Sequence, residues 1–280
     1  MTLSTHPDPV LVLGATGKTG RRVADLLEQA GTPVRRASRT SAHPFSWTDP
    51  ATWPGALDGV GAVYVTFFPD LAAPGADTVL DRLGREVAAR GITRAVLLSG
   101  RGEPAAARSE AAFVAHVPTA TVVRCAWFAQ NFTEGIFAPG VAAGRFGLPA
   151  PATTVEPFVD ADDIAACIVT LLADDTPVGQ RHDLTGPKAI SLAAVADALA
   201  AATGRPVAYE EATVEGFAAG MEGEGLAPDE ALGLAHALAE VFDGRSEAVT
   251  DGVERLLGRP PRSFATFAAD AFAAERVGAA

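Results

Sequence analysis

The sequence predicts an α/β protein, a doubly wound parallel sheet with a smaller, mainly helical C-terminal lobe. Three observations predict this class. Strand and helix signals alternate through the first half of the 280-residue chain, as they do in parallel sheets covered by helices on both faces. A glycine-rich segment joins the first strand signal to the first helix signal, and from residue 191 the signals are mainly helical. We therefore expect a nucleotide-binding domain over residues 1–150, to which 151–190 add late strands and a helix, and a substrate-binding lobe over 191–280.

The first half contains five apolar strand signals separated by segments of helical spacing. Unbroken apolar runs suit parallel strands, because such strands are buried on both faces. Glycine follows two of the helical segments, where it commonly ends a helix. The expected strands are Val10–Leu13, Val34–Ser38, Ala62–Phe67, Arg94–Leu98 and Thr121–Arg124, and the expected helices are Lys18–Ala30, Thr78–Arg90 and Ala105–Ala115.

The second half has two late strand signals and then mostly helical spacing. Ser191 is the expected N-cap of a helix that Gly204 ends, and Gly220–Gly225 is expected to form a flexible turn or loop. The expected strands are Val155–Val159 and Arg181–Leu184, and the expected helices are Ile164–Leu172, Leu192–Ala202, Val214–Met221, Pro228–Phe242, Val249–Leu257 and Phe264–Arg276.

Composition excludes several classes of function. Hydrophobic residues make up 48% and charged residues 20%, so a sizeable core forms and global disorder is excluded. The net charge of −12 disfavours nucleic acid and anionic membranes as partners. Cys125 and Cys167 are too few for a disulfide framework, and the N-terminal segment lacks the pattern of a signal peptide. We expect a cytoplasmic protein that acts on a small molecule.

The strongest motif is the segment Gly14–Gly20, with the spacing Gly-x-x-Gly-x-x-Gly. Gly14 permits a tight turn, Gly17 lets the backbone approach a pyrophosphate, and Gly20 lets the helix pack on the sheet. The free N–H groups of the following helix attract the anion. We expect a dinucleotide here, bound by Gly14, Thr16, Gly17, Lys18 and Thr19; the alternative is a glycine-rich turn without a ligand.

The segment Val34–Thr40 indicates which dinucleotide binds. An NAD site usually has a carboxylate at the end of the second strand, whereas this segment has none and contains three arginines. Arg39, beside Ser38, is expected to hold a 2′-phosphate through charge-assisted hydrogen bonds, which favours NADP(H). The alternative, solvated surface arginine, is expected for at least one of Arg35 and Arg36.

Other strand ends supply further candidates, because open α/β sheets bind ligands at the carboxyl edge of their strands. Thr66, Phe67, Ser99 and Gly100 are expected to contact the cofactor, with core packing as the alternative for phenylalanine. Three residues after the next strand are expected to bind substrate, two as an aromatic wall and one as a polar anchor, while core packing remains the alternative for one of the aromatic pair. They are Trp127, Phe128 and Asn131.

Several segments together resemble the NmrA-like atypical short-chain dehydrogenase/reductases, and most of all their ergot-alkaloid reductase branch. The resemblance implies NADP(H) on a Rossmann domain, a substrate held between that domain and the C-terminal lobe, and a place in secondary metabolism. It also matches Ser99 to the serine of the superfamily's catalytic set. The matching segments are Gly14–Gly20, Ser99–Glu103, Trp127–Phe132, Pro157–Ile164, Leu184–Pro187 and Gly258–Pro261.

One departure from the superfamily bears on the reaction. Its usual proton donor is the tyrosine of Tyr-x-x-x-Lys, but Phe68 and Thr213 stand four positions after the only tyrosines, Tyr64 and Tyr209. We therefore leave the catalytic residue unassigned. We expect hydride transfer to an acceptor that needs no enzyme acid: a C=N bond, a quinone or a conjugated C=C bond. The alternatives are an NADP(H)-binding redox sensor without turnover and an NADP-bound cyclase or isomerase.

The remaining polar residues are expected to be structural. Glu110 and His116 occupy the place of the missing motif, on nearly opposite faces of their helix, and are not expected to act as a pair. Three aspartates precede the expected helix Ile164–Leu172, where helix capping explains them better than a metal does. They are Asp160, Asp162 and Asp163. No metal-ligand spacing of histidine or cysteine occurs, so we expect no metal.

Overall fold

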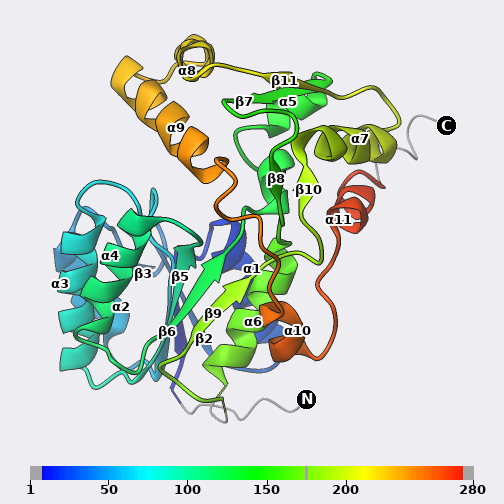
Figure 1. Ribbon diagram of the computed structural model, residues 1–280. Coiled ribbons are helices and arrows are strands. Elements are labelled where there is room, and N and C mark those ends of the chain that lie inside the picture. The colour runs from blue at the N-terminus through cyan, green and yellow to red at the C-terminus, as the bar shows by residue number, and fades with distance from the viewer. Residues whose placement is uncertain (1–7, 174–175, 274–280) are drawn as a thin grey trace. The chain divides into compact units, whose positions relative to one another are not determined.

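The computed structural model describes residues 8–173 and 176–273 (Figure 1). These residues form two compact units whose segments interleave along the chain. Unit 1 comprises the described residues of Met1–Cys125, Ala161–Leu184 and Asp251–Pro260; unit 2 comprises those of Ala126–Asp160, Thr185–Thr250 and Pro261–Ala280. The expected domains are contiguous, whereas the chain passes between the units five times. The cofactor-binding and substrate-binding roles of the units stay predictions.

Unit 1 is built on a seven-stranded sheet in which all neighbouring strands are parallel. The chain first adds β2 and β3 on one side of β1, and from β4 onward it adds strands on the other side. The point between β1 and β4 is therefore the topological switch point, outside which open α/β sheets bind ligands. In spatial order the strands are β3 (His43–Pro44), β2 (Val34–Ser38), β1 (Val10–Leu13), β4 (Ala62–Val65), β5 (Arg94–Gly100), β6 (Thr121–Cys125) and β9 (Arg181–Leu184).

Helices cover both faces of this sheet (Figure 1). One layer consists of α2 (Trp53–Leu57), preceded by the short 3-10 helix η1 (Pro50–Thr52), with α3 (Ala76–Ala89) and α4 (Pro104–Val114). The other consists of α1 (Lys18–Gln29), α6 (Ala161–Leu172) and α10 (Gly252–Leu257). In α1, Val23, Ala24 and Leu27 form a buried stripe, which is the spacing that makes this segment an amphipathic helix. The doubly wound architecture expected from the sequence is confirmed.

Unit 2 combines helices with two small sheets. β8 (Val155–Glu156) pairs antiparallel with β10 (Ile190–Ser191), and β7 (Arg145–Leu148) pairs parallel with β11 (Ala208–Glu211). Phe132 lies at the centre of an aromatic core, with four other phenylalanine rings within 5.6 Å of its centroid. The helical elements are η2 (Ala129–Phe132), α5 (Ala138–Ala142), α7 (Leu192–Thr203), α8 (Val214–Gly223), α9 (Pro228–Val241) and α11 (Phe264–Ala271).

Most expected elements agree with the structure to within a few residues, and the differences are in unit 2. Gly220–Gly225 is not a loop throughout, because α8 continues to Gly223 and packs against α9. The strand β7 lacks a sequence signal; its pairing with β11 creates it. The strand expected over Val155–Val159 ends at Glu156, where its two-residue pairing with β10 ends. The C-terminal part of the helix expected over Phe264–Arg276 lies outside the described residues.

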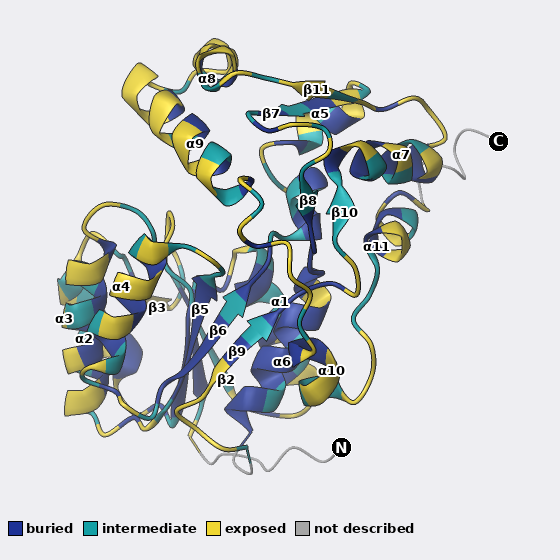
Figure 2. Cartoon of the chain, viewed as in Figure 1, coloured by how far each residue is buried: buried dark blue, intermediate teal, exposed yellow. Residues whose placement is uncertain are grey.

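The pattern of buried and exposed residues agrees with a sheet that is covered by helices on both faces (Figure 2). The strands β1 and β4 are buried along their whole length, while α3 and α9 expose one side to solvent. Ser191 caps α7 by accepting a hydrogen bond from the amide of Ala194, and Gly204 ends it with a φ of 73°, as expected. None of the helices within residues 8–173 and 176–273 has the length and apolar character needed to cross a membrane.

His182 is an unusual member of the unit 1 core. It lies in the edge strand β9, is 7% exposed, and neither ring nitrogen has a hydrogen-bond partner among the described residues. Burial and the positive charge of Arg255, in α10, lower the pKa of His182, while Asp183 opposes that shift. A buried, unpaired imidazole destabilises the fold because it lost hydration without gaining a partner.

We predict that His182→Leu raises the free energy of unfolding at neutral pH by about 1 kcal/mol, because an apolar side chain of similar size removes the unpaired groups. The wild type should also lose stability as the pH falls below about 6.5, since the unfolded imidazole binds a proton that the folded one resists. The loss continues down to the lowered folded-state pKa.

Urea denaturation at about pH 7.5 and about pH 5.5 tests both statements. His182→Leu should lose less stability on acidification than the wild type. His43→Gln, at an exposed position, is the matched control and should behave as the wild type does. Equal acid sensitivity of wild type and His182→Leu would contradict the assignment.

Candidate functional site

The turn Gly14–Gly20 joins β1 to α1 in a geometry that depends on its three glycines. Gly14 has a φ of +64°, which only glycine adopts readily. The amide of Gly17 donates to the carbonyl of Gly14 over 2.8 Å, which closes the turn. A Cβ atom on Gly20 would lie 2.2 Å from that same carbonyl oxygen, so α1 can start this close to β1 only without a side chain at position 20.

The N-terminus of α1 suits an anion. The helix has no side-chain N-cap hydrogen bond and no acidic residue in its first turn. Its first residues instead include three basic ones, Lys18, Arg21 and Arg22. Their positive charge has the same sign as this end of the helix dipole. Thr16 and Gly17, just before the helix, are exposed. An anion at this end would interact favourably with both the dipole and the basic side chains.

Thr19 differs from its neighbours in this motif. Its side chain is 4% exposed and accepts a hydrogen bond of 2.8 Å from the hydroxyl of Tyr64, in β4. The hydroxyl of Thr19 therefore points into the core of unit 1, and a contact of Thr19 with the cofactor stays a prediction. This interaction fastens the first turn of α1 to the neighbouring strand.

The three arginines in and just after β2 differ in their partners. Arg35 donates to two backbone carbonyl groups at the end of α2, and Arg36 forms ion pairs with two carboxylates of α1. Both therefore have structural partners. Arg39 is exposed, follows Ser38 at the carboxyl end of the strand, and has no hydrogen-bond or ion-pair partner among the described residues. It is the arginine of this segment whose guanidinium is open to a ligand.

The end of β4 lies beside the glycine turn. A Cβ atom on Gly14 would lie 2.8 Å from the side-chain methyl of Thr66, so Thr66 closes one wall of the turn. Phe67 packs its ring edge against Trp47, with centroids 4.7 Å apart. Phe68 is 74% exposed. Phe67 thus packs partly into the core at the carboxyl edge of the sheet, and its contact with the cofactor stays a prediction.

Ser99, Glu110 and Arg124 form a polar network at the end of β5, in which Ser99 and Glu110 are buried and Arg124 is partly exposed. Ser99 and Arg124 are register partners on β5 and β6, and Glu110 reaches them from α4. The Ser99 hydroxyl donates to Glu110 over 2.6 Å, and the Arg124 guanidinium donates to both oxygens of the same carboxylate. Sequence reasoning missed this network. An arginine within the apolar strand Thr121–Cys125 was the available signal, because a buried charge needs a partner.

Neither tyrosine is placed to act as an acid. Tyr64 is fully buried, and burial raises its pKa. Tyr209 donates its hydroxyl proton to the carbonyl groups of Leu148 and Ala150, and partial burial raises its pKa as well. His116 is paired with Asp81 over 2.7 Å, away from Glu110. These groups hold the fold together and carry no proton toward the carboxyl edge of the sheet.

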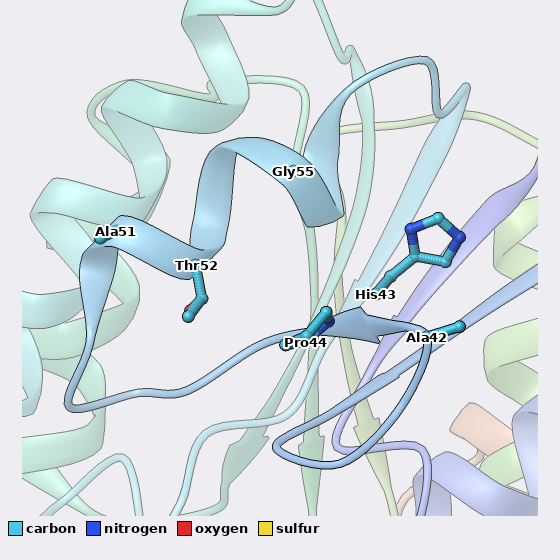
Figure 3. Close-up of a pocket in the computed structure, with 6 residues that line it drawn as sticks. All are labelled: Ala42, His43, Pro44, Ala51, Thr52 and Gly55. Atoms are coloured by element: carbon cyan, nitrogen blue, oxygen red, sulfur yellow. The ribbon is translucent and has the colours of Figure 1, made fainter.

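A cavity of about 300 Å³ lies at the outer edge of unit 1, beside β3 (Figure 3). Apart from one histidine and one threonine, small or apolar residues line it, and Figure 3 shows the His43 and Thr52 side chains pointing in different directions. Without converging polar groups this cavity is a poor candidate for a reaction site. Its lining residues are Ala42, His43, Pro44, Ala51, Thr52 and Gly55.

The residues expected to bind substrate belong to unit 2. Trp127 is half-buried, with Phe242 and Phe137 ring centroids at 4.8 and 5.6 Å, so one part of its ring belongs to the core. Phe128 and Asn131 are also partly exposed. Phe137, which packs against Trp127, is buried in the core. A role in substrate binding stays a prediction for Trp127, Phe128 and Asn131.

The three aspartates at the start of α6 have arginine partners; Asp160 precedes the helix, and Asp162 and Asp163 lie in its first turn, which begins earlier than expected. Asp160 is paired with Arg262 over 2.8 Å and also accepts a hydrogen bond from Gln130. Asp163 is paired with Arg259, and the exposed Asp162 with Arg22 of α1, each over 2.6 Å. Within the described ranges, no group of three His, Cys, Asp or Glu side chains is arranged to hold a metal ion. Both cysteines are buried free thiols, and burial raises their pKa, to about 12 for Cys167.

The structure thus brings most of the predicted cofactor contacts to one edge of one sheet. Gly14–Lys18, Ser38 and Arg39, Thr66 and Phe67, and Ser99 and Gly100 follow or end the strands β1, β2, β4 and β5 of unit 1. The carboxyl ends of parallel strands meet at a single edge, so distant segments of the sequence converge there. The arrangement offers a helix N-terminus for a pyrophosphate and an open guanidinium for a further phosphate.

Comparisons with known proteins agree with this geometry. No family model matches the chain. The chain is 33% identical over 284 residues to the uncharacterized oxidoreductase YesF of Bacillus subtilis, covering 94% of each protein. It is 29% identical to agroclavine dehydrogenase of Claviceps fusiformis, covering 93% of this chain and 96% of that one. Among solved structures, the NADPH-dependent quinone oxidoreductase of Escherichia coli in complex with NADPH superposes with a TM-score of 0.79, at 19% identity and over 94% and 99% of the two chains.

We predict that Gly20→Ala destabilises the protein by about 1–3 kcal/mol, because its Cβ atom would press on the backbone oxygen of Gly14 and displace the start of α1. The matched control is Gly233→Ala in α9, where no atom lies within 4 Å of the added Cβ. That change should stabilise by about 0.5–1 kcal/mol. Chemical denaturation measures both, and equal effects of the two changes would contradict the close packing at Gly20.

Proposed function

Because this chain belongs to the NmrA-like family of atypical short-chain dehydrogenase/reductases, a family of oxidoreductases, we propose that it is an NADPH-dependent reductase of a small molecule. We propose further that it transfers hydride to a C=N bond, a quinone or a conjugated C=C bond. The substrate would be an aromatic or alkaloid-like metabolite. The identity with agroclavine dehydrogenase and the fold shared with a quinone oxidoreductase support this range of acceptors.

One observation carries the choice of acceptor: neither tyrosine is available as a proton donor. Both tyrosines are hydrogen-bonded to other protein groups, and the carboxylate that accepts from Ser99 is paired with Arg124. A simple ketone needs a proton as it is reduced. An iminium ion is already cationic, and a quinone or enone delocalises the incoming charge and takes its proton from water. The acceptor that fits this site best therefore needs no enzyme acid.

The cofactor site rests on the carboxyl edge of unit 1. In the proposed complex the amides at the start of α1 bind the pyrophosphate, and Gly17 lets it approach the backbone closely. Arg39 binds the 2′-phosphate, for which Arg35 and Arg36 are not open. Thr66, Phe67, Ser99 and Gly100 border the nicotinamide half. When bound, NADPH supplies the hydride.

The protein's own contribution to catalysis is then to position the hydride acceptor against the cofactor. A flat acceptor would lie against the exposed parts of Trp127 and Phe128, with Asn131 as a polar anchor. Holding two reactants in a reactive orientation alone supplies roughly 7–11 kcal/mol of the barrier reduction in favourable cases. Hydride transfer to an activated acceptor fits that mode of catalysis, since no proton has to be delivered at the same moment.

We predict that the purified protein oxidises NADPH in the presence of a cyclic iminium, a quinone or a conjugated enone. Loss of the NADPH absorbance, compared with a protein-free reaction, measures this, and simple ketones serve as the negative class. Reduction of the ketones at the same rate would contradict the argument from the missing acid. Cofactor binding with no oxidation of NADPH by any acceptor would favour a redox sensor over a reductase.

We predict that Arg39→Glu weakens NADPH binding by about 10- to 100-fold, the effect of losing a charge-assisted contact to a phosphate. NADH binding should change little, because NADH lacks the 2′-phosphate. Fluorescence titration with both cofactors measures the two affinities. Arg108→Glu, an equal change of charge on the exposed surface of α4, is the control and should leave both affinities unchanged. Equal weakening of both cofactors by Arg39→Glu would overturn the assignment.

A further inference from the structure

Ser99 donates its hydroxyl proton into the protein. The acceptor is Oε1 of Glu110, 2.6 Å away, and Glu110 is 1% exposed. A serine hydroxyl has one proton and two lone pairs. With that proton directed toward α4, Ser99 has only acceptor capacity left for any other partner.

Arg124 prevents the opposite arrangement, in which Glu110 would donate to Ser99. Its Nε atom lies 2.9 and 3.1 Å from the two carboxylate oxygens, and its Nη2 atom lies 2.6 Å from Oε2. Every contact of the carboxylate is thus with a donor. Hydrogen bonds to Glu110 in turn raise the pKa of Arg124, so its guanidinium keeps all its donors. The direction of the Ser99 hydrogen bond is therefore set by the buried Glu110 and the partly exposed Arg124.

The place of Ser99 in the fold makes this direction relevant to ligands. Ser99 is one residue from the end of β5, beside β4, whose own end borders the glycine turn. Ser99 is 5% exposed, and its position in β5 is at the carboxyl end of the strand. A bound molecule that reaches Ser99 there meets an oxygen that accepts and does not donate.

We propose that Glu110 and Arg124 fix Ser99 as a hydrogen-bond acceptor for an N–H group of the bound cofactor or substrate. This inference rests on the proposed function. The N–H donor is either the carboxamide of the nicotinamide ring or a protonated nitrogen of the hydride acceptor. Ser99 is accordingly unable to polarise a carbonyl oxygen by donating to it, so selectivity at this position favours nitrogen donors. Glu110 and Arg124 act through Ser99 and are positioning residues.

The closing experiment measures binding and does not depend on turnover. NADP⁺ and its 3-acetylpyridine analogue, in which a methyl ketone replaces the carboxamide, are titrated calorimetrically into each protein variant. If the carboxamide donates to Ser99, the wild type should bind the analogue about 3- to 10-fold more weakly, the effect of one lost hydrogen bond. Ser99→Ala should bind both dinucleotides equally well.

Glu110→Gln is the decisive variant, because it keeps the shape of the network and reverses its polarity. The amide oxygen pairs with Arg124, the amide nitrogen donates to Ser99, and the Ser99 proton is released to point outward. Glu110→Gln should therefore remove the preference for NADP⁺ over the analogue. The control is Glu156→Gln, a carboxylate in unit 2 that is 2% exposed and accepts from the Trp127 amide. It should keep the preference.

A second arm tests the substrate as the donor. The KM values of a cyclic iminium bearing N–H and of its N-methyl derivative are compared in the wild type and in Ser99→Ala. A preference for the N–H compound that disappears in Ser99→Ala supports the proposal with the substrate as the source. The proposal is overturned if the wild type, Ser99→Ala and Glu110→Gln, all folded by circular dichroism, show the same preference between the two dinucleotides and the same preference between the two iminiums. Failure of the wild type to bind either dinucleotide would instead overturn the proposed function.

Discussion

The close approach of α1 to β1 is the constraint on which the candidate site depends. At Gly20 the helix backbone passes so near the Gly14 carbonyl that a Cβ atom would lie 2.2 Å from it. This approach aims the start of α1, with its uncapped amides and basic side chains, at the carboxyl edge of the sheet. The hydroxyl of Thr19, bound by Tyr64 of β4, fastens the same turn from inside. The anion-binding character of the edge is thus a product of backbone packing.

Paired buried charges form a second constraint. Glu110, Asp160 and Asp163 are each at most 1% exposed, and each has an arginine partner within 2.8 Å. Removing the arginine of such a pair typically costs about 3–5 kcal/mol, because the carboxylate then remains buried alone. These pairs are directional as well as charged, so they fix the orientation of neighbouring groups. At Ser99 this direction bears on ligand recognition.

The proposed site combines recognition of a phosphate-bearing ligand with tyrosines whose hydroxyl groups are bonded elsewhere in the protein. Arg39, with no partner among the described residues, contrasts with the two arginines before it, whose guanidinium groups stabilise α1 and α2. The tyrosines are engaged inside their own units. A reductase built this way depends on an acceptor that is reactive by itself and on accurate placement beside the cofactor. That dependence links the missing Tyr-x-x-x-Lys motif to the chemistry proposed here.

The sequence by itself determined the fold class, most of the elements of unit 1 and the glycine turn, because local spacing and single glycines encode them. Val10–Leu13, Val34–Ser38 and Arg181–Leu184 were predicted to the residue. Only the tertiary structure decided which arginine within residues 34–40 stays open to a ligand. It also decided that Glu110 and Arg124 meet beside Ser99, and that β7 pairs with β11. The physical reason is the same in each case. Pairing between residues far apart in the chain depends on which segments become neighbours in space, and the local sequence does not encode that.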